Sequence, residues 1–191
     1  MGFAIAEHLA NLGAKVILVT GPVAIQCRNS NINRIDVVLA VEMLEKCLKH
    51  FEACNGAIMV AAVADFAPII TETKKIKRTS GNYFIELRPN PDIAASLGKI
   101  KLDNQILVGF ALETDDEELN AIAKMEKKNL DFIVLNSLRD SGSGFQYDTN
   151  RIKILDKNGI VQAFDLKQKS EVAVDIVNKL IEMEGGITER F

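Results

Sequence analysis

Small and charged side chains follow a predicted buried strand at residues 61–65, a position where a ligand can meet the backbone. The stretch reads Ala61-Ala-Val-Ala-Asp65. In open parallel sheets ligands bind beyond the carboxyl ends of strands, and small residues there let the backbone approach a ligand. The carboxylate of Asp65 could hold a hydroxyl group or a metal-bound phosphate. The same residues could equally be structural, with alanines packed against a helix and Asp65 capping a turn.

Two groups of cations could meet phosphates. Lys124 and Lys128 are four residues apart on a predicted helix and so share a face, opposite an apolar stripe of Leu119, Ile122 and Ala123. On residue types alone, a solvated surface is the simpler interpretation of that pair. The second group crowds one strand of a predicted hairpin, as either a charged sheet edge or a mobile flap over a polyphosphate. Its members are Lys74, Lys75, Lys77 and Arg78.

The segment Asn90-Pro-Asp-Ile93 has the pattern of a helix start. Asn90 is the expected N-cap and Pro91 the expected first helical residue. The free backbone N–H groups of such a start could bind an anion, although capping alone explains the pattern.

The elements that must position these residues follow from apolar periodicity. Gly13 ends the first helix, and continuous apolar runs indicate strands buried on both faces. Helices are predicted at 1–12, 41–52, 115–128 and 169–183, strands at 15–20, 35–38, 56–62, 105–111 and 131–135, and hairpins at 74–78/83–87 and 151–155/160–164. This order predicts an α/β fold, a Rossmann-like three-layer sandwich with a mostly parallel sheet and two hairpin additions, in one domain spanning 1–191. A doubly wound sheet that opens with a helix lacks its usual first strand.

Composition excludes several classes of protein. A net charge of −3 over 191 residues argues against general nucleic-acid binding. The chain has no apolar run long enough for a membrane span and no secretory pattern, so we expect a cytoplasmic protein. Cys27, Cys47 and Cys54 form no Cys-x-x-Cys, and the only histidines are His8 and His50, which makes a zinc site or a disulfide framework improbable.

Taken together, the sequence resembles the phosphopantothenoylcysteine synthetase family along almost its whole length. Eight stretches match in the family's order: Met1-Gly-Phe-Ala-Ile-Ala6, Val19-Thr-Gly-Pro-Val23, Ala61-Ala-Val-Ala-Asp-Phe66, Lys75-Ile-Lys-Arg78, Asn90-Pro-Asp-Ile93, Val108-Gly-Phe-Ala-Leu-Glu-Thr114, Lys128-Asn-Leu-Asp131 and Gly144-Phe-Gln-Tyr-Asp-Thr-Asn150. No single stretch is decisive, but eight in order are specific.

The resemblance implies a ligase of coenzyme A biosynthesis. CTP, or ATP in eukaryotic relatives, would activate the carboxylate of 4′-phosphopantothenate as an acyl-nucleotide with loss of pyrophosphate. The amine of L-cysteine would then attack, and Mg²⁺ would neutralise the phosphates. The family also implies a homodimer. In many bacterial relatives this domain is fused behind a flavin-dependent phosphopantothenoylcysteine decarboxylase.

Site residues carry over by position within the matching stretches. The resemblance makes Lys75 the catalytic flap lysine, which stabilises the activation step. The resemblance also implies that Lys124 and Lys128 contact the phosphates, which replaces the interpretation of this pair as solvated surface. The remaining matches are nucleotide contacts at the strand exit (Met59, Val60, Ala61 and Asp65), the base and sugar pocket (Asn90, Pro91, Asp92, Ile93 and Phe110), and the backbone that meets the acyl intermediate (Ala61 and Ala62).

The sequence also departs from the family. Relatives have an upstream strand and a glycine-rich segment, whose end Met1-Gly2 resembles, and the family's active-site asparagine has no counterpart here. We therefore expect this chain alone to show little or no turnover, and an added N-terminal segment to restore it. Arg78 stands where many relatives have lysine.

Two other functions remain open. Residues 2–19 resemble the opening of the short-chain NAD(P)-dependent oxidoreductases. Those enzymes need a Tyr-x-x-x-Lys pair, but Leu87 follows Tyr83 at that spacing and Arg151 follows Tyr147. The other alternative is a nucleotide-binding chain without turnover.

Overall fold

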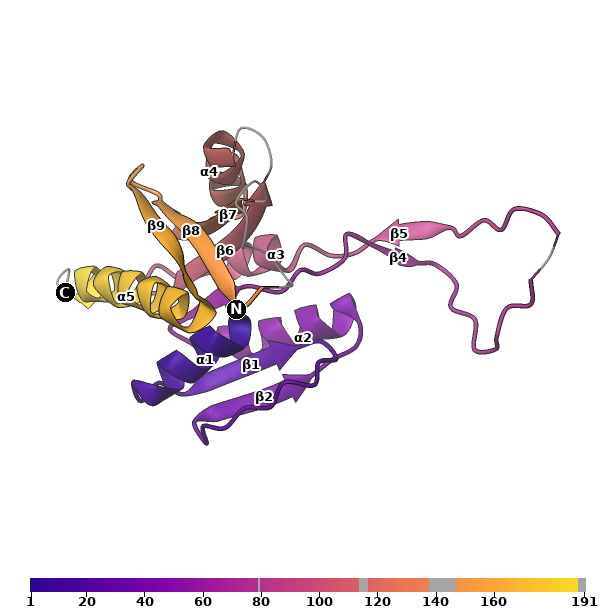
Figure 1. Cartoon of the computed structure of the whole chain (residues 1–191), viewed down its shortest axis with the longest axis horizontal. Coiled ribbons are helices and arrows are strands. Elements are labelled where there is room, and N and C mark those ends of the chain that lie inside the picture. Colours follow the sequence, from indigo (N-terminus) through magenta and orange to yellow (C-terminus); the bar gives the residue numbers. More distant parts are fainter. Residues whose placement is uncertain (79, 114–116, 138–146, 189–191) are drawn as a thin grey trace.

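The main sheet of the computed structural model has the strand order β3-β6-β7-β8-β9. The structure describes residues 1–78, 80–113, 117–137 and 147–188. The first three strands run parallel to one another, β8 is antiparallel to β7, and β9 is antiparallel to β8 (Figure 1). Their bounds are β3 (Gly56–Met59), β6 (Ile106–Glu113), β7 (Phe132–Ser137), β8 (Thr149–Asp156) and β9 (Val161–Gln168).

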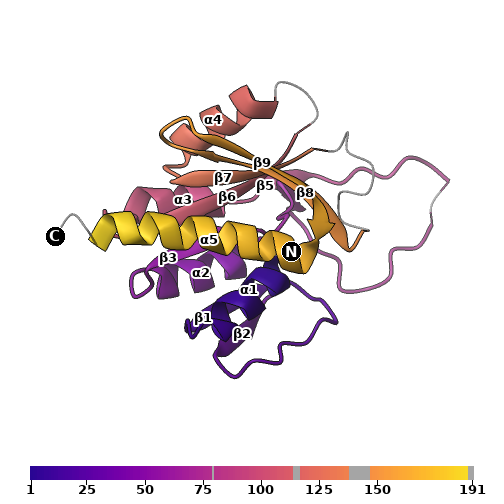
Figure 2. The same cartoon turned by 60° about the vertical axis from the view of Figure 1, so that its left-hand side comes forward.

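Helices cover both faces of this sheet. In β6, Val108 packs into a cluster under α1 (Gly2–Asn11) and α5 (Lys169–Thr188), while Leu107 packs into a cluster on the opposite face (Figure 2). That opposite face is covered by α2 (Ala40–Phe51), α3 (Ile93–Ile100) and α4 (Glu117–Lys127). Successive side chains of a strand point to opposite faces, so one apolar run supplies both clusters. The predicted three-layer α/β fold is confirmed.

The N-terminal strands form a sheet of their own. β1 (Val16–Thr20) pairs in parallel with β2 (Ile32–Asp36), and neither is hydrogen-bonded to the main sheet. The predicted burial of strands 15–20 and 56–62 on both faces is therefore wrong. Ile17 is 36% exposed and every residue of β3 is only partly buried. In the described residues β1 pairs with β2 alone and β3 with β6 alone, so each is an edge strand. The short strand predicted at 35–38 begins earlier, at Ile32, and β3 ends at Met59.

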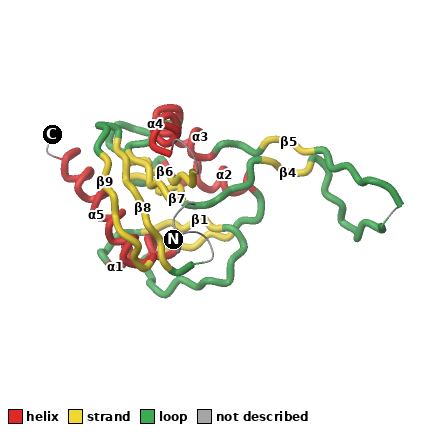
Figure 3. Tube along the Cα trace, turned by 45° about the horizontal axis from the view of Figure 1, so that its top comes forward, coloured by secondary structure: helices red, strands yellow, loops and turns green. Residues whose placement is uncertain are grey.

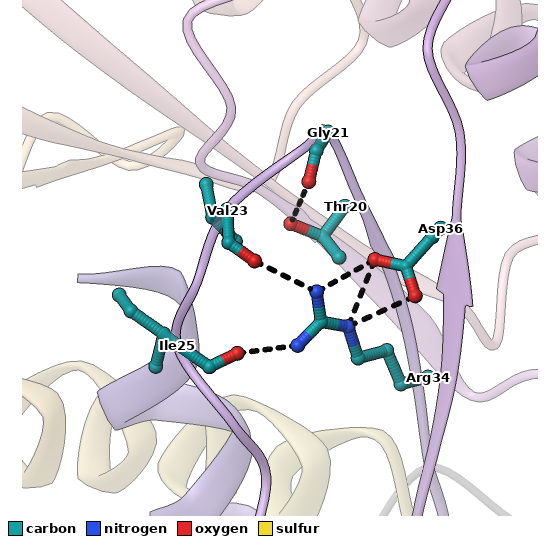
Figure 4. A network of polar contacts seen from close by, with 6 residues as sticks. All are labelled: Thr20, Gly21, Val23, Ile25, Arg34 and Asp36. Atoms are coloured by element: carbon teal, nitrogen blue, oxygen red, sulfur yellow. Dashed lines mark hydrogen bonds and ion pairs between the residues drawn. The ribbon is translucent and has the colours of Figure 1, made fainter.

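Arg34 of β2 fixes the loop that follows β1 (Figure 4). Its guanidinium donates to the carbonyl oxygens of Val23 and Ile25 and to both carboxylate oxygens of Asp36. It also lies 5.6 Å from the ring centroid of Phe3 in α1, so one side chain joins the loop, the strand and the helix.

A long arm leaves the body between β3 and α3 (Figures 1 and 3). Among the described residues, its two sides form paired strands at β4 (Phe66–Pro68) and β5 (Leu87–Pro89) alone, with one more backbone hydrogen bond next to each end of this ladder. The predicted hairpin strands at 74–78 and 83–87 are therefore misplaced: their described residues, apart from Leu87, lie in no strand, and Thr79 of the expected turn falls outside the described residues. A two-stranded ribbon without a packed face is marginal in water, which accounts for the short pairing.

The second hairpin and the C-terminal helix agree with expectation. β8 and β9 flank the turn at 156–159, where Gly159 has a φ of 78°. The turn is tied to α5 by a buried ion pair of 3.1 Å between Lys179 and Asp156. Burial acts to raise the pKa of Asp156, but Lys179 and the N–H groups of Ile160 and Asn158 outweigh it and lower that pKa. Within the described residues, no helix is both long and apolar enough to cross a bilayer.

The Lys179–Asp156 pair yields a stability prediction. Lys179→Met leaves a carboxylate buried without its cation, and should lower the free energy of unfolding at pH 7 by about 3–5 kcal/mol. Because the pKa of Asp156 is lowered in the folded state, the pair stabilises the fold above the ordinary carboxyl pKa, and the difference should shrink as the pH falls through the folded pKa.

The measurement is urea unfolding at pH 7 and at acid pH, beside Lys153→Met as the control. Lys153 makes a solvent-exposed pair with Glu118, so its loss should change stability by no more than about 1 kcal/mol. Equal losses from the two variants would contradict a special role for the buried pair.

Candidate functional site

A hollow of about 210 Å³ opens beyond the carboxyl end of β3, beside the middle of β6. Met59 and Ala61 line it from the end of β3, and Phe110 lines it from β6. The starts of parallel strands lie at one edge and their ends at the other, so these side chains meet at the sheet edge where α/β proteins bind ligands. The predicted site residues in its lining are Met59, Ala61, Asp65, Asn90, Pro91, Asp92, Ile93, Phe110, Lys124 and Lys128.

Asn90 joins the strand exit to the start of α3. Its backbone N–H donates to the carbonyl oxygen of Asp65 at 2.8 Å, and its side-chain amide donates to that of Ala64 at 2.9 Å. The prediction that Asn90 caps the helix is therefore wrong. Asp92 is the N-cap, and its carboxylate accepts from the N–H of Ala95 at 3.0 Å. The helix begins at Ile93, two residues later than expected, because the carboxylate of Asp92 satisfies the free N–H.

A cation from the turn that follows α4 reaches the same helix start. The ammonium of Lys128 lies 3.1 Å from the second carboxylate oxygen of Asp92. Partial burial acts to raise the pKa of Asp92, but the Ala95 N–H, Lys128 and Lys127 outweigh it and lower that pKa. The hollow thus has an N-terminal helix end and a lysine side by side on one wall, an arrangement that favours an anion.

The buried face of α4 differs from the expected one. Ala121 and Met125 are buried, whereas Leu119 is 71% exposed, so the predicted stripe of Leu119, Ile122 and Ala123 is wrong. Burial at 121 and 125 places Lys128, one turn further along, on the side that faces the sheet. Lys124 is exposed and still contributes to the rim of the hollow.

The turn after α4 sets the position of Lys128. Asn129 has a φ of 52° and donates from its side chain to the carbonyl oxygen of Gly98 at 2.9 Å. A Cβ at Gly98 would overlap the carbonyl oxygen of Lys128, so only glycine allows α3 and this turn to approach so closely. The sequence contains the residues that this contact needs, Gly98 and Lys128-Asn129. Their role cannot be read from the sequence, because they lie about thirty residues apart and only the fold brings them together.

Three predicted site residues lie elsewhere. Val60 packs against the cluster under α1 and α5, and Ala62 is exposed outside the lining. Lys75 is exposed on the arm and does not line the hollow. A second, larger space of about 520 Å³ lies under the arm's tip, but all its lining residues, such as Ile76 and Tyr83, are exposed, so it is open loop space rather than an enclosed site.

Several lining residues were not expected from the sequence. They are mostly apolar and come from α2, the loop after β3, α3, the strands β6 and β7, and the turn between α4 and β7. Gly109 of β6 admits the side chain of Leu130, which a Cβ would overlap. The unexpected members are Met43, Val63, Ala64, Ala94, Gly109, Leu130 and Ile133.

Comparison with known proteins gives the family. The family model described as the DNA/pantothenate metabolism flavoprotein C-terminal domain matches residues 1–183. The chain is 38% identical over 190 residues to the Bacillus subtilis coenzyme A biosynthesis bifunctional protein CoaBC, covering 100% of this chain and 47% of that protein. It is 55% identical over 181 residues to a cysteine/cysteine sulfinic acid decarboxylase of an unknown prokaryotic organism, covering 95% and 50%. The chain thus spans about half the length of these curated relatives.

Solved structures agree with this assignment. A crystal structure of the C-terminal domain of the coenzyme A biosynthesis bifunctional protein CoaBC superposes with a TM-score of 0.79 at 36% identity, covering 95% of this chain and 81% of that one. The fold is also shared, at 16% identity and a TM-score of 0.65, with the Cab2 mutant H337A in complex with phosphopantothenate-cysteine, covering 84% and 55%. The chain therefore belongs to the family of DNA/pantothenate metabolism flavoprotein C-terminal domains, which confirms its resemblance to the phosphopantothenoylcysteine synthetases.

Proposed function

We propose that the hollow binds the nucleoside triphosphate of a ligase that joins 4′-phosphopantothenate to L-cysteine. The observation that carries this proposal is the wall where Lys128 meets the start of α3, since both favour a phosphate. Phe110 and the segment Asn90–Ile93 lie across the same space and offer an apolar face and backbone groups to a base and sugar. The relatives named for coenzyme A biosynthesis support the same reaction.

The reaction has two steps. A carboxylate oxygen of 4′-phosphopantothenate attacks the α-phosphorus of CTP, or of ATP, and pyrophosphate leaves with the bonding electrons. The amine of cysteine then attacks the acyl carbon, loses a proton, and expels the nucleoside monophosphate. Negative charge grows on the phosphates in the first step, and the ammonium groups of Lys124 and Lys128 would stabilise that charge.

Mg²⁺ could be held in this site jointly by the phosphates of the nucleotide and by a protein carboxylate. The described residues contain no group of three or more histidine, cysteine or acidic side chains that could hold a metal alone. Mg²⁺ commonly takes one or two carboxylates together with substrate phosphates, and Asp65 in the hollow's lining would supply one. The ion would neutralise phosphate charge.

Lys75 lies on the arm between β4 and β5 and does not line the hollow of the same chain, so it needs a route to the phosphates. The arm also exposes large apolar side chains, among them Phe84 at 87% and Ile70 at 75%. Exposed apolar surface of this kind marks a contact surface for protein. We propose that the arm packs against a second copy in a homodimer, which would place its cations near a nucleotide.

A decarboxylase function rests on weaker ground. The name of one relative includes decarboxylation, but this chain matches half of that protein, and the decarboxylase would be the other half, fused or separately encoded. The hollow is lined by lysines and carboxylates and by neither cysteine nor histidine among the described residues, which suits phosphate chemistry. An NAD(P)-dependent oxidoreductase of the short-chain type would need a Tyr-x-x-x-Lys pair, and this sequence contains none.

Nucleotide preference can be measured by thermal unfolding of the chain. CTP with Mg²⁺ should raise the melting temperature more than NAD or NADP does, because a ligand that binds only the native state stabilises it. Equal or greater stabilisation by NADP would contradict the ligase proposal and favour an oxidoreductase.

The phosphate contact of Lys128 has a matched control one residue away. Lys128→Gln should weaken CTP binding by roughly tenfold to a hundredfold, the scale of one charged hydrogen bond. Lys127→Gln removes the same charge at the last residue of α4, outside the lining, and should weaken binding far less. Isothermal titration of both variants beside the unaltered chain is the measurement. If the two weaken binding equally, the helix attracts the nucleotide only through its net charge.

The role of Lys75 is tested by turnover. In a chain preceded by the family's N-terminal segment, Lys75→Gln should slow pyrophosphate release by roughly 10²–10³-fold while CTP binding changes little, as expected for a contact made mainly in the transition state. Lys77→Gln on the same arm should cost much less. Similar losses from both would mean that the arm acts as a diffuse positive field.

A further inference from the structure

The walls of the hollow are of two kinds. One wall carries charge, since it contains the ion pair of Lys128 with Asp92. Another is apolar, and its side chains belong to a single cluster that lines the hollow with Met43, Met59, Val63 and Ile93. The base is the least polar part of a nucleotide and the phosphates are its most charged part. A nucleotide bound as proposed above would therefore place its base against the apolar wall.

Met43 lies in the first turn of α2, where the helix start is held by hydrogen bonds. The carboxylate of Glu42 accepts from the backbone N–H groups of Val38 and Leu39 at 2.8 and 2.9 Å. The N–H of Met43 donates to the carbonyl oxygen of Leu39 at 3.0 Å. A glutamate that returns to the backbone ahead of its helix fixes the entry of the chain, so the backbone position of Met43 is fixed as well.

The side chain of Met43 is also held by its neighbours. It is 8% exposed and packs with Ile93 of α3, which is 5% exposed. Val19 of β1 and Ile35 of β2 pack against the same cluster. Met43 cannot withdraw from the hollow without opening a cavity among these side chains, and such a cavity is costly.

The hollow is small for a nucleotide. Ligand pockets in proteins commonly measure about 300–1,000 Å³, whereas this one measures about 210 Å³. Adenine has two fused rings and cytosine has one, so the two bases differ in size more than in polarity. In a space with little room to spare, a fixed side chain in the apolar wall decides which base fits.

We propose that Met43 selects the base of the nucleotide. Its thioether closes the apolar end of the hollow to the fused rings of a purine and leaves room for the single ring of a pyrimidine. The selection is by size, because the side chain of Met43 has no strong hydrogen-bond donor or acceptor. This inference rests on the proposed function, since it concerns the nucleotide bound in the hollow.

The test is isothermal titration of the chain with CTP, UTP and ATP in the presence of Mg²⁺. The unaltered chain should bind CTP roughly tenfold more tightly than ATP, or more. Met43→Ala removes the thioether and should reduce this CTP-to-ATP preference by roughly tenfold, the scale on which an apolar pocket responds to a change of size. The ratio of CTP to UTP affinity should stay the same, because these two bases are equal in size.

Met125→Ala is the matched control. Met125 is equally buried, at 4% exposed, but it belongs to the cluster under α4 and does not line the hollow. Its truncation should destabilise the fold through a similar cavity and leave the CTP-to-ATP ratio unchanged. Met43→Leu conserves volume and should keep the preference of the unaltered chain.

A CTP-to-ATP ratio that Met43→Ala leaves unchanged, or that Met125→Ala lowers as much, would overturn the inference. ATP binding by the unaltered chain as tight as CTP binding would overturn it too. If Met43→Ala does not fold, Met43→Val leaves a smaller cavity, and its ratio must fall for the inference to stand. An unaltered chain that binds none of the three nucleotides would contradict the proposed function, and this inference with it.

Discussion

The hydrogen-bond ladder of β6 with β3 and β7 is the constraint on which the rest of the structure depends. β6 is paired in parallel on both sides, with Val108 matched to Ile58 on one side and to Phe132 on the other. β3 ends opposite Gly109, four residues before β6 ends, and the hollow forms beyond the end of β3 against the part of β6 that continues. At the amino ends of β6 and β7, the carboxylate of Asp131 links the two strands. It accepts hydrogen bonds from the backbone N–H of Leu107 and from the ammonium of Lys101, each at 2.8 Å.

Chemistry at the hollow follows from that pairing. The segment after β3 contributes small residues and a carboxylate, and the middle of β6 contributes Phe110. The lysines come from α4 and from the turn that follows it. α3 turns its start toward the same space because Gly98 lets it approach the turn after α4. An anion bound as we propose would meet a helix N-terminus and Lys128, whose partner Asp92 is a carboxylate that a phosphate could replace.

Sequence reasoning recovered the elements whose signal is local. The apolar runs at 105–111 and 131–135 and the turn at 156–159 needed no tertiary information, because strand length and the Asn-Gly turn determine them. What it missed depends on contacts distant in sequence. The buried face of α4 shifted to Ala121 and Met125 because of the sheet beneath it, and the helix cap moved to Asp92 because Asn90 binds the 64–65 loop.

A co-crystal structure of the chain with CTP and Mg²⁺ tests the central claim most directly. The account predicts the base and ribose between Phe110 and the Asn90–Ile93 segment, with the phosphates at Lys124 and Lys128 and the Lys128–Asp92 pair broken or lengthened from 3.1 Å. Nucleotide density at another part of the molecule, with the hollow holding only solvent, would contradict it.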